Sequence, residues 1–201
     1  MAQTTFFGLQ LLTARGDVMT PRAATEQLVA GALEWISDRA ACVVDVGTGS
    51  GAIAIAIASA APAAHVWATD TSRCAVALAR ANVRRHGLSD RVTVRRGNLL
   101  DPVPDPIDLV VANLPYLPMA DAHRYPDLVA EPPTAVFGPG DGLEPYRRLL
   151  AACNDRLTGD AAVVIQLHRS ALVATARELP ALRARLESDA PHQLVPQLAA
   201  A

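Results

Sequence analysis

The sequence contains no lysine, and aromatic residues make up only 4% of its 201 positions. All 18 cationic side chains are therefore arginines, set against 20 acidic residues, and the formal net charge is −2. A chain without excess positive charge has little capacity to displace counterions from nucleic acid, which disfavours strong non-specific binding. The three cysteines, Cys42, Cys74 and Cys153, are far apart in the sequence and form no C-x-x-C pair. We therefore expect neither a disulfide framework nor a metal site.

The sequence also lacks a hydrophobic run long enough to span a membrane. Residues 46–69 carry no charge, but glycine, serine, proline and histidine interrupt them, and their longest unbroken apolar run is 52–58. A membrane helix needs about 20 apolar residues. Residues 1–10 show neither the basic start nor the small-residue cleavage site of a secretory signal. We expect a cytoplasmic protein with reduced thiols and no membrane partner.

What the chain does have is an apolar content of 51%, enough for one globular domain with a substantial core. Apolar strands alternate with helices along its length. We expect strands at 42–46, 66–69, 91–95, 107–112 and 161–167, and helices at 23–39, 52–61, 72–86, 144–157 and 170–179. This alternation is typical of a doubly wound α/β fold, in which helices cover both faces of a parallel sheet.

The structure of two segments cannot be predicted from hydrophobic periodicity alone. Residues 52–58 alternate alanine with isoleucine, a pattern that by itself favours a strand. A glycine turn precedes them, alanine is the best helix former, and Ile53 and Ile57 are four positions apart, so we expect a helix. Residues 113–142 are rich in proline and show no regular pattern, which is typical of a functional loop.

The first motif is DVGTGSG at residues 45–51, between a predicted strand and a predicted helix. Glycines two apart let the backbone turn tightly and approach a ligand closely. Open α/β sheets bind ligands at the carboxyl ends of their strands, where this loop lies. Asp70 ends the next predicted strand, about 20 residues further on, and is placed to accept hydrogen bonds from ribose hydroxyls.

This loop resembles the D/E-x-G-x-G-x-G motif of class I S-adenosylmethionine-dependent methyltransferases, whereas the dinucleotide motif has the spacing G-x-G-x-x-G. The resemblance implies a Rossmann-like sheet on which the three glycines approach the methionyl part of the cofactor and Asp70 holds the ribose. It places Asn98 beside the adenine amine, with Asp101 as an alternative. The implied cofactor-binding residues are Asp45, Gly47, Thr48, Gly49, Gly51, Asp70, Thr71, Asn98, Leu99 and Asn113.

The second motif is NLPY, formed by Asn113, Leu114, Pro115 and Tyr116 directly after the predicted strand 107–112. It resembles the N/D-P-P-Y motif of methyltransferases that modify planar nitrogens, which are poor nucleophiles because their lone pair is delocalised. Asn113 offers a carboxamide oxygen and Leu114 a carbonyl to hold such an NH2 group. Pro115 biases Leu114 toward an extended backbone, and Tyr116 offers a flat face. The resemblance implies catalysis by positioning, without a strong base.

The form N-L-P-Y is also familiar from ribosomal RNA adenine dimethyltransferases, so further stretches are needed to distinguish the families. TPRAATE at 20–26 resembles the P-R-P-x-T-E segment of HemK-type protein-glutamine methyltransferases. EPPTAVFG at 131–138 and DGLEPYR at 141–147 resemble their E-P-x-x-A-L-x-G-G-x-D-G-L-x-x-Y-R stretch. With both motifs, the match runs in order from about residue 20 to about residue 167, and it identifies the chain as HemK-type.

This resemblance implies methylation of a glutamine amide in a protein, such as the Gly-Gly-Gln tip of a translation release factor. We expect one catalytic domain over 1–201, with a helical lead-in at 1–40, no separate N-terminal substrate domain, and a shortened final strand pair within 182–201. Three alternatives stay open: a nucleic-acid adenine methyltransferase, which would need a basic cleft beside Tyr116; a small-molecule or peptide methyltransferase; and a non-catalytic cofactor-binding subunit of a partner chain. The mildly acidic charge makes nucleic acid the less favoured substrate.

Overall fold

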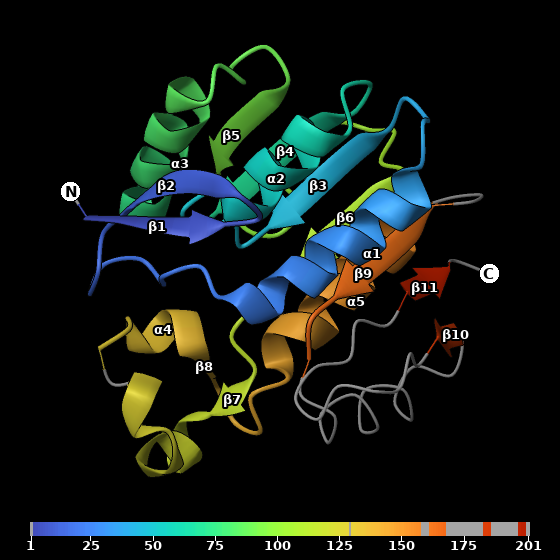
Figure 1. Cartoon of the computed structure of the whole chain (residues 1–201). Coiled ribbons are helices and arrows are strands. Elements are labelled where there is room, and N and C mark those ends of the chain that lie inside the picture. The colour runs from blue at the N-terminus through green and yellow to red at the C-terminus, as the bar shows by residue number, and fades with distance from the viewer. Residues whose placement is uncertain (1, 129, 158–160, 168–182, 186–196, 200–201) are drawn as a thin grey trace.

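A seven-stranded sheet forms the centre of the protein, with the strand order β10-β11-β9-β6-β3-β4-β5 (Figure 1). The computed structural model describes residues 2–128, 130–157, 161–167, 183–185 and 197–199. Five strands run parallel. They are β3 (Cys42–Val46), β4 (His65–Asp70), β5 (Val92–Arg96), β6 (Leu109–Ala112) and β9 (Ala162–Ile165). All five were predicted from the sequence, with small shifts at their ends.

Two short antiparallel strands complete the sheet. β11 (Gln197–Ala199) pairs with β9, and β10 (Arg183–Arg185) pairs with β11. This confirms the shortened final strand pair that the sequence predicts. The predicted helix at 170–179 lies outside the described residues.

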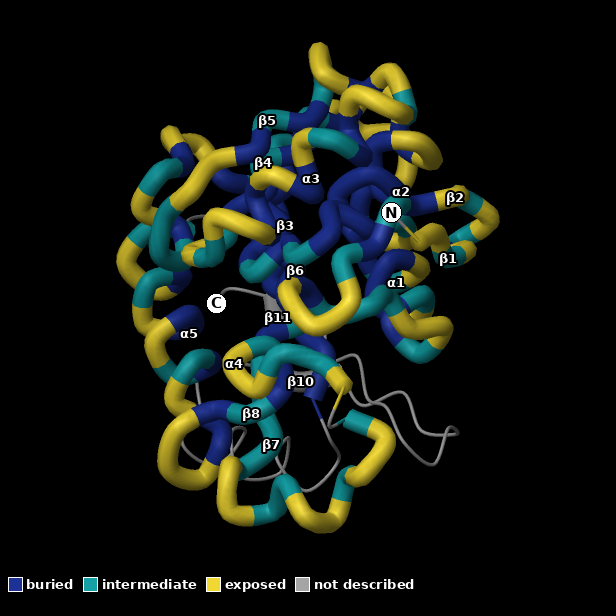
Figure 2. Tube along the Cα trace, turned by 90° about the vertical axis from the view of Figure 1, so that its left-hand side faces the viewer, coloured by how far each residue is buried: buried dark blue, intermediate teal, exposed yellow. Residues whose placement is uncertain are grey.

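Helices cover both faces of the sheet, as the apolar strands require. On one face pack α1 (Glu26–Ile36), α2 (Ala52–Ala60) and α3 (Arg73–Arg85), and on the other packs α5 (Glu144–Arg156). Alternate residues of β3 point to opposite faces, so Val43 joins one core cluster and Val44 the other. Figure 2 shows the buried residues concentrated in the central strands and in α2, while exposed residues lie on the outer turns.

The α2 helix confirms that context overrides the alternating pattern of alanine and isoleucine. Gly51 precedes it in a left-handed conformation with φ 84°, which turns the chain from the loop into the helix. All residues of 52–58 are buried, alanines and isoleucines alike. A helix apolar on every side has no preferred face, so its sequence carries no helical period to detect.

The predicted helical lead-in at 1–40 is wrong for its first part. β1 (Ala2–Phe6) and β2 (Leu9–Thr13) form an antiparallel hairpin before the short 3₁₀ turn η1 (Ala23–Thr25) and α1. Phe7 and Gly8 make its two-residue turn, both with positive φ (49° and 74°), as such hairpins require. The Glu26 carboxylate accepts the Phe7 N–H at 2.7 Å, so α1 anchors this turn.

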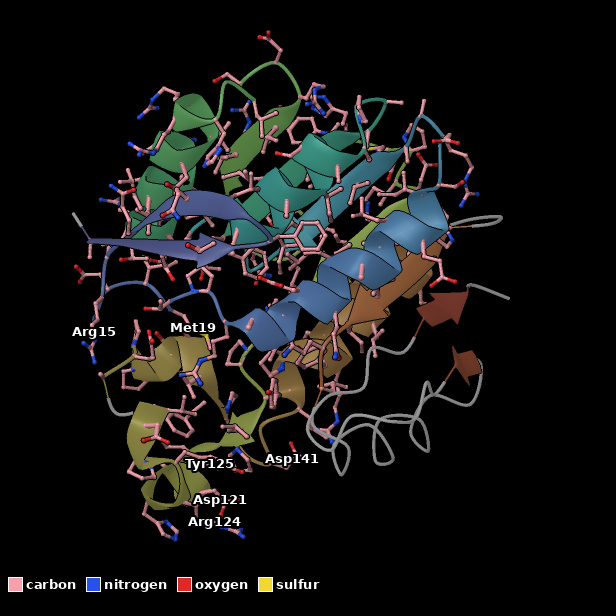
Figure 3. All side chains as sticks on the ribbon, viewed as in Figure 1. Arg15, Met19, Asp121, Arg124, Tyr125 and Asp141 are labelled. Carbon is pink, nitrogen blue, oxygen red and sulfur yellow. The ribbon has the colours of Figure 1, made fainter. Side chains whose placement is uncertain are left out.

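The proline-rich segment 113–142 consists of short pieces rather than a regular element. It holds β7 (Leu117–Pro118), the 3₁₀ turns η2 (Met119–Arg124) and η3 (Pro126–Leu128), a single helical turn α4 (Pro133–Val136), and β8 (Phe137–Gly138), which pairs with β7. Figure 3 shows that Asp121, Arg124 and Tyr125 lie at its far end, away from the sheet. Every helix in the described part of the chain is too short or too polar to span a lipid bilayer.

Candidate active site

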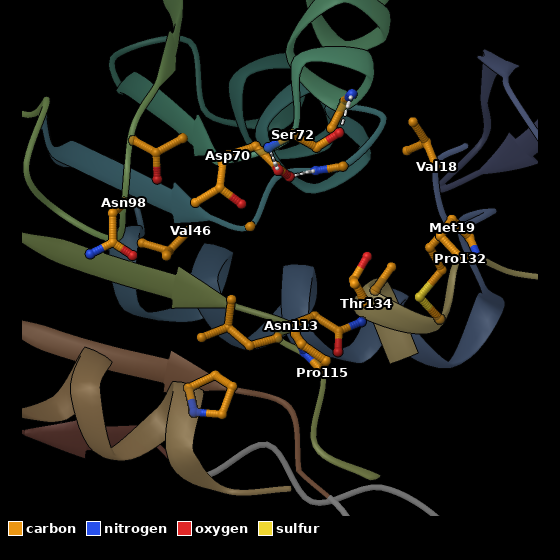
Figure 4. Close-up of a pocket in the computed structure, with 18 of the residues that line it drawn as sticks. Val18, Met19, Val46, Asp70, Ser72, Asn98, Asn113, Pro115, Pro132 and Thr134 are labelled. Carbon is orange, nitrogen blue, oxygen red and sulfur yellow. Dashed lines mark hydrogen bonds between the residues drawn. The ribbon is translucent and has the colours of Figure 1, made fainter. Parts of the chain in front are cut away.

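A cavity of about 320 Å³ opens at the carboxyl ends of β3, β4 and β6. Gly47 and Gly49 line it from the loop after β3, Asp70 and Thr71 from the end of β4, and Asn113 from the end of β6. Figure 4 shows Asp70 and Asn98 toward one end, and Asn113, Thr134 and Met19 toward the other. The cavity therefore joins the two sequence motifs, as their positions after neighbouring parallel strands predict.

The glycine loop lies close to the NLPY motif, and Gly47 shows why a side chain is excluded there. Its φ is +74°, and a Cβ atom at this position would lie 2.7 Å from Leu114 Cδ2. The loop is fixed to the next strand by two backbone bonds, because the Gly47 and Thr48 amides both donate to the Thr69 carbonyl, at 2.9 and 3.0 Å. Loop, strand end and NLPY motif are therefore in fixed relation to one another.

Asp45, Thr48 and Gly51 are predicted cofactor-binding residues that do not line the cavity. Asp45 is fully buried in β3 beneath the loop, where its Oδ2 accepts the Thr48 hydroxyl at 2.5 Å and the Ala54 amide at 3.2 Å. Its Oδ1 has no hydrogen-bond partner. Burial raises the pKa of Asp45 to about 7, against the opposing effect of the two bonds, and nearby Asp70 adds to the rise. The geometry gives Asp45 a supporting position beneath the glycine loop.

Asp70 presents its carboxylate to the cavity. Its Oδ2 accepts the Gly49 amide at 3.0 Å and its Oδ1 accepts the Ser72 amide at 2.8 Å. Each oxygen retains a lone pair, because a carboxylate offers about four acceptor positions. These two bonds orient the carboxylate and leave it able to accept hydroxyl donors from a ligand.

The far end of the cavity is lined by Thr71, Asn98 and Leu99. Asn98 Oδ1 accepts a hydrogen bond from the guanidinium of Arg148 at 3.2 Å, and Arg148 also lines the cavity. Asp101, the sequence alternative to Asn98, is not a lining residue. Arg148 comes from α5 and belongs to no recognisable motif, so it was not predicted as a site residue.

At the other end, the NLPY motif is held by side chains from two distant segments. Asn113 Nδ2 donates to Thr25 Oγ1 at 3.1 Å. The Leu114 amide donates to the hydroxyl of Tyr146 at 2.8 Å, and that hydroxyl also lies 3.2 Å from the Leu114 carbonyl oxygen. Asn113, Leu114 and Pro115 all line the cavity. Thr25 and Tyr146 fall inside the stretches that carry the family resemblance, but the sequence offered no reason to assign them a role.

Tyr116, the fourth predicted catalytic residue, is half-buried and is not among the lining residues. It packs against the core cluster beside α5, and burial raises the pKa of its hydroxyl, with Arg22 acting in the opposite direction. Its expected role as a platform for a planar group stays a prediction.

The N-terminal segment forms one side of the cavity, although no motif in it predicted this position. Asp17, Val18 and Met19 line it, as do Pro132 and Thr134 of the 113–142 segment. Figure 4 shows Met19 beside Pro132. The Thr20 amide donates to the carboxylate of Glu131 at 3.0 Å and so joins the two segments. Among the described residues, the charged ones that line the cavity are Asp17, Asp70 and Arg148. This lining has no excess of positive charge and so does not favour a nucleic-acid substrate.

The parallel sheet, the glycine loop at the end of β3, the carboxylate at the end of β4 and the NLPY motif at the end of β6 together define a class I methyltransferase. Residues 24–130 match the family described as "Methyltransferase small domain", and the chain belongs to that family. Its curated relatives place it, within this class, in the HemK family, as the sequence motifs predict.

One such relative is the release factor glutamine methyltransferase of Gloeobacter violaceus, 46% identical over 138 residues, which cover 67% of this chain and 48% of the relative. Another is the ribosomal protein uL3 glutamine methyltransferase of Bordetella pertussis, 37% identical over 155 residues, covering 75% of this chain and 52% of the relative. The chain therefore spans about half the length of these relatives.

Among solved structures, the catalytic domain of hMettl16 in complex with the MAT2A 3′UTR hairpin 6 has a TM-score of 0.78 and 16% sequence identity. The match covers 96% of this chain and 76% of that one. At this identity the likeness shows the fold alone, and it confirms the Rossmann-like methyltransferase sheet.

Proposed function

We propose that this protein transfers a methyl group from S-adenosylmethionine to the side-chain amide nitrogen of a glutamine in a protein, with a translation release factor as the first candidate substrate. The proposal rests on one observation: Asn113 and Leu114, which carry the two acceptor groups, line the same cavity as the glycine loop and Asp70. The names of the curated relatives support glutamine as the methylated residue.

The residues present fit the cofactor. Gly47 and Gly49 bring bare backbone to the cavity wall, and Asp70 holds a carboxylate that can accept the two hydroxyls of a ribose. Asn98 and Leu99 offer a polar and an apolar surface for an adenine ring. S-adenosylmethionine supplies an electrophilic methyl group on its sulfonium sulfur when bound.

The protein's own contribution would be orientation. An unmethylated glutamine amide has two N–H donors, and Asn113 Oδ1 and the Leu114 carbonyl are two acceptors on adjacent residues. Holding both N–H groups directs the nitrogen toward the methyl group and lowers the entropic part of the barrier. Pro115 follows directly and restricts the Leu114 backbone to an extended conformation, so the carbonyl direction is preset. We further propose that the reaction takes place in the cytoplasm.

The test is to incubate the protein with S-adenosylmethionine labelled in the methyl group. Three separate reactions contain a release factor, ribosomal protein uL3 or total RNA as the acceptor. Mass spectrometry then locates the label. We expect label on a glutamine side chain and a loss of at least about 100-fold in turnover for Asn113→Ala, a typical effect of removing a transition-state hydrogen bond. Label on an adenine base, or full turnover by Asn113→Ala, would contradict the proposal.

A further inference from the structure

Two buried hydroxyl groups from outside the NLPY motif contact it from different elements. Thr25 ends the short turn η1 before α1 and is 6% exposed. Tyr146 lies in the first turns of α5 and is completely buried. In sequence they are 88 and 32 positions away from the residues that they contact. Neither lines the cavity, so any effect on a substrate must pass through the motif itself.

The contact with Thr25 fixes the direction of the Asn113 amide. Nδ2 of Asn113 donates to Thr25 Oγ1 at 3.1 Å. In a carboxamide the NH2 group and the oxygen leave the same trigonal carbon in different directions within one plane. Binding the NH2 group to the protein therefore commits the oxygen, the only acceptor of this side chain, to the other side. Asn113 itself lines the cavity (Figure 4).

The contacts of Tyr146 fix the Leu114 peptide and leave its carbonyl able to accept. The Leu114 amide donates to the phenol oxygen at 2.8 Å. The phenol has one proton, and two carbonyls compete for it: Gln166 at 2.6 Å and Leu114 at 3.2 Å. The shorter bond takes the proton. Burial also raises the pKa of Tyr146 well above its ordinary value, so the phenol keeps that proton at neutral pH.

We propose that Thr25 and Tyr146 are positioning residues, which hold Asn113 Oδ1 and the Leu114 carbonyl as a matched pair of acceptors for the two N–H groups of the substrate amide. Both hydroxyls satisfy the donor groups of the motif, Asn113 Nδ2 and the Leu114 amide, from within the protein. The Asn113 oxygen and the Leu114 carbonyl then remain as acceptors for the substrate. The site would thereby select an NH2 group over a carbonyl or a carboxylate, which bring no donor. This inference rests on the proposed function.

The experiment compares Tyr146→Phe and Thr25→Val, which each remove one hydroxyl and keep the shape, with Thr25→Ser, which restores the hydroxyl. Turnover is measured with labelled S-adenosylmethionine and the methylated protein found above, and the affinity for S-adenosylhomocysteine by calorimetry. We expect kcat to fall at least about 10-fold in Tyr146→Phe and in Thr25→Val, and to recover to within about 3-fold in Thr25→Ser, because each hydroxyl orients one transition-state acceptor. The affinity of each variant for S-adenosylhomocysteine should differ from that of the wild type by less than about 2-fold. An unchanged affinity shows that the cofactor site of the variant is still folded.

A matched control and a double-variant cycle separate positioning from general stability. Thr93→Val makes the same change on β5, where the Thr93 hydroxyl contacts only His65 among the bonds described, and should leave kcat unchanged. In the Asn113→Ala background, Thr25→Val should have no further effect, because the hydroxyl acts only through the Asn113 amide. Unchanged kcat in both Tyr146→Phe and Thr25→Val, or an equal loss in the Asn113→Ala background, would overturn the inference.

A further measurement does not depend on the acceptor. The side-chain amide protons of Asn113 are observed by ¹H–¹⁵N NMR, and Thr25→Val should shift them toward the values of a free amide. Absence of this shift would overturn the inference even if the enzyme methylates glutamine. If the wild-type protein methylates no glutamine but the shift is seen, the proposed function fails and the role of Thr25 in orienting Asn113 stands.

Discussion

The backbone amide of Gly49 donates to the carboxylate of Asp70 at 3.0 Å, and so ties the loop after β3 to the end of β4. The same carboxylate accepts the Ser72 amide from the start of α3. Asp70 therefore holds the glycine loop and the start of α3 in fixed relation to each other. A cavity wall that is fixed in this way reduces the entropy lost on ligand binding.

We expect Asp70→Asn to weaken the binding of S-adenosylhomocysteine. An asparagine has one acceptor oxygen, and its NH2 group would face one of the two amide donors that the carboxylate now accepts. Hydrogen bonds to charged groups contribute about 1.5–3 kcal/mol, so the dissociation constant should rise about 10-fold to 100-fold. Isothermal titration calorimetry measures this directly. Asp101→Asn, an exposed carboxylate outside the cavity, is the matched control and should bind like the wild type.

Gly47→Ala and Gly8→Ala together isolate the contact between the glycine loop and Leu114. Both glycines have φ +74°, but a Cβ on Gly8 has nothing within 4 Å, whereas one on Gly47 meets Leu114 Cδ2. Backbone strain should cost each variant roughly 1–2 kcal/mol of unfolding free energy. Gly47→Ala alone should also displace Leu114 and reduce turnover. Equal turnover in the two variants would show that the contact has no functional consequence.

The raised pKa of Asp45 predicts a specific dependence of protein stability on pH. Its pKa is raised to about 7 in the folded protein, so between the ordinary aspartate pKa near 4 and pH 7 the folded state holds a proton that the unfolded chain releases. Stability from this group therefore falls as pH rises through that window, by up to about 1.4 kcal/mol per pH unit, and levels off above it. Asp45→Asn, which resembles the protonated acid, lacks this dependence.

The measurement for Asp45 is urea unfolding of both proteins at pH 5 and pH 8. All other titrating groups are shared, so the difference between the two proteins isolates Asp45. The asparagine variant should gain in stability relative to the wild type on going from pH 5 to pH 8. A difference that stays constant between the two pH values would contradict the raised pKa.

Asn82→Ala should destabilise the protein through the N-terminal hairpin. Asn82 is fully buried in α3, accepts the Leu12 amide at 2.8 Å, and donates to the carbonyls of Leu12 and Ser50 at 3.1 and 2.9 Å. Losing these bonds in a buried position should cost about 2–4 kcal/mol. Urea unfolding checks the value, and faster amide exchange in residues 2–13 would locate the effect. Asn154→Ala, on the exposed side of α5, should change stability by no more than about 0.5 kcal/mol.

Several features could be predicted from the sequence because their causes are local. The apolar runs at 42–46 and 161–167 predict buried parallel strands, since strands covered on both faces read as continuous hydrophobic segments. The position of the glycine loop and of Asn113 after such strands predicts that they meet, because the carboxyl ends of parallel strands share one edge. The hairpin at 2–13 was missed, although Gly8 and the alternation around it were the available signals.

The sequence by itself determined the class of fold and the placing of the glycine loop and the NLPY motif at one edge of the sheet, because each depends on residue types at short, fixed spacings. Only the tertiary structure decided which groups support them. It placed Asp45 beneath the loop, and it brought Thr25 and Tyr146 to the motif across long separations in sequence. A single sequence does not encode such pairings in any local pattern. They follow from how α1 and α5 pack against opposite faces of the sheet, which places one hydroxyl on each side of the end of β6.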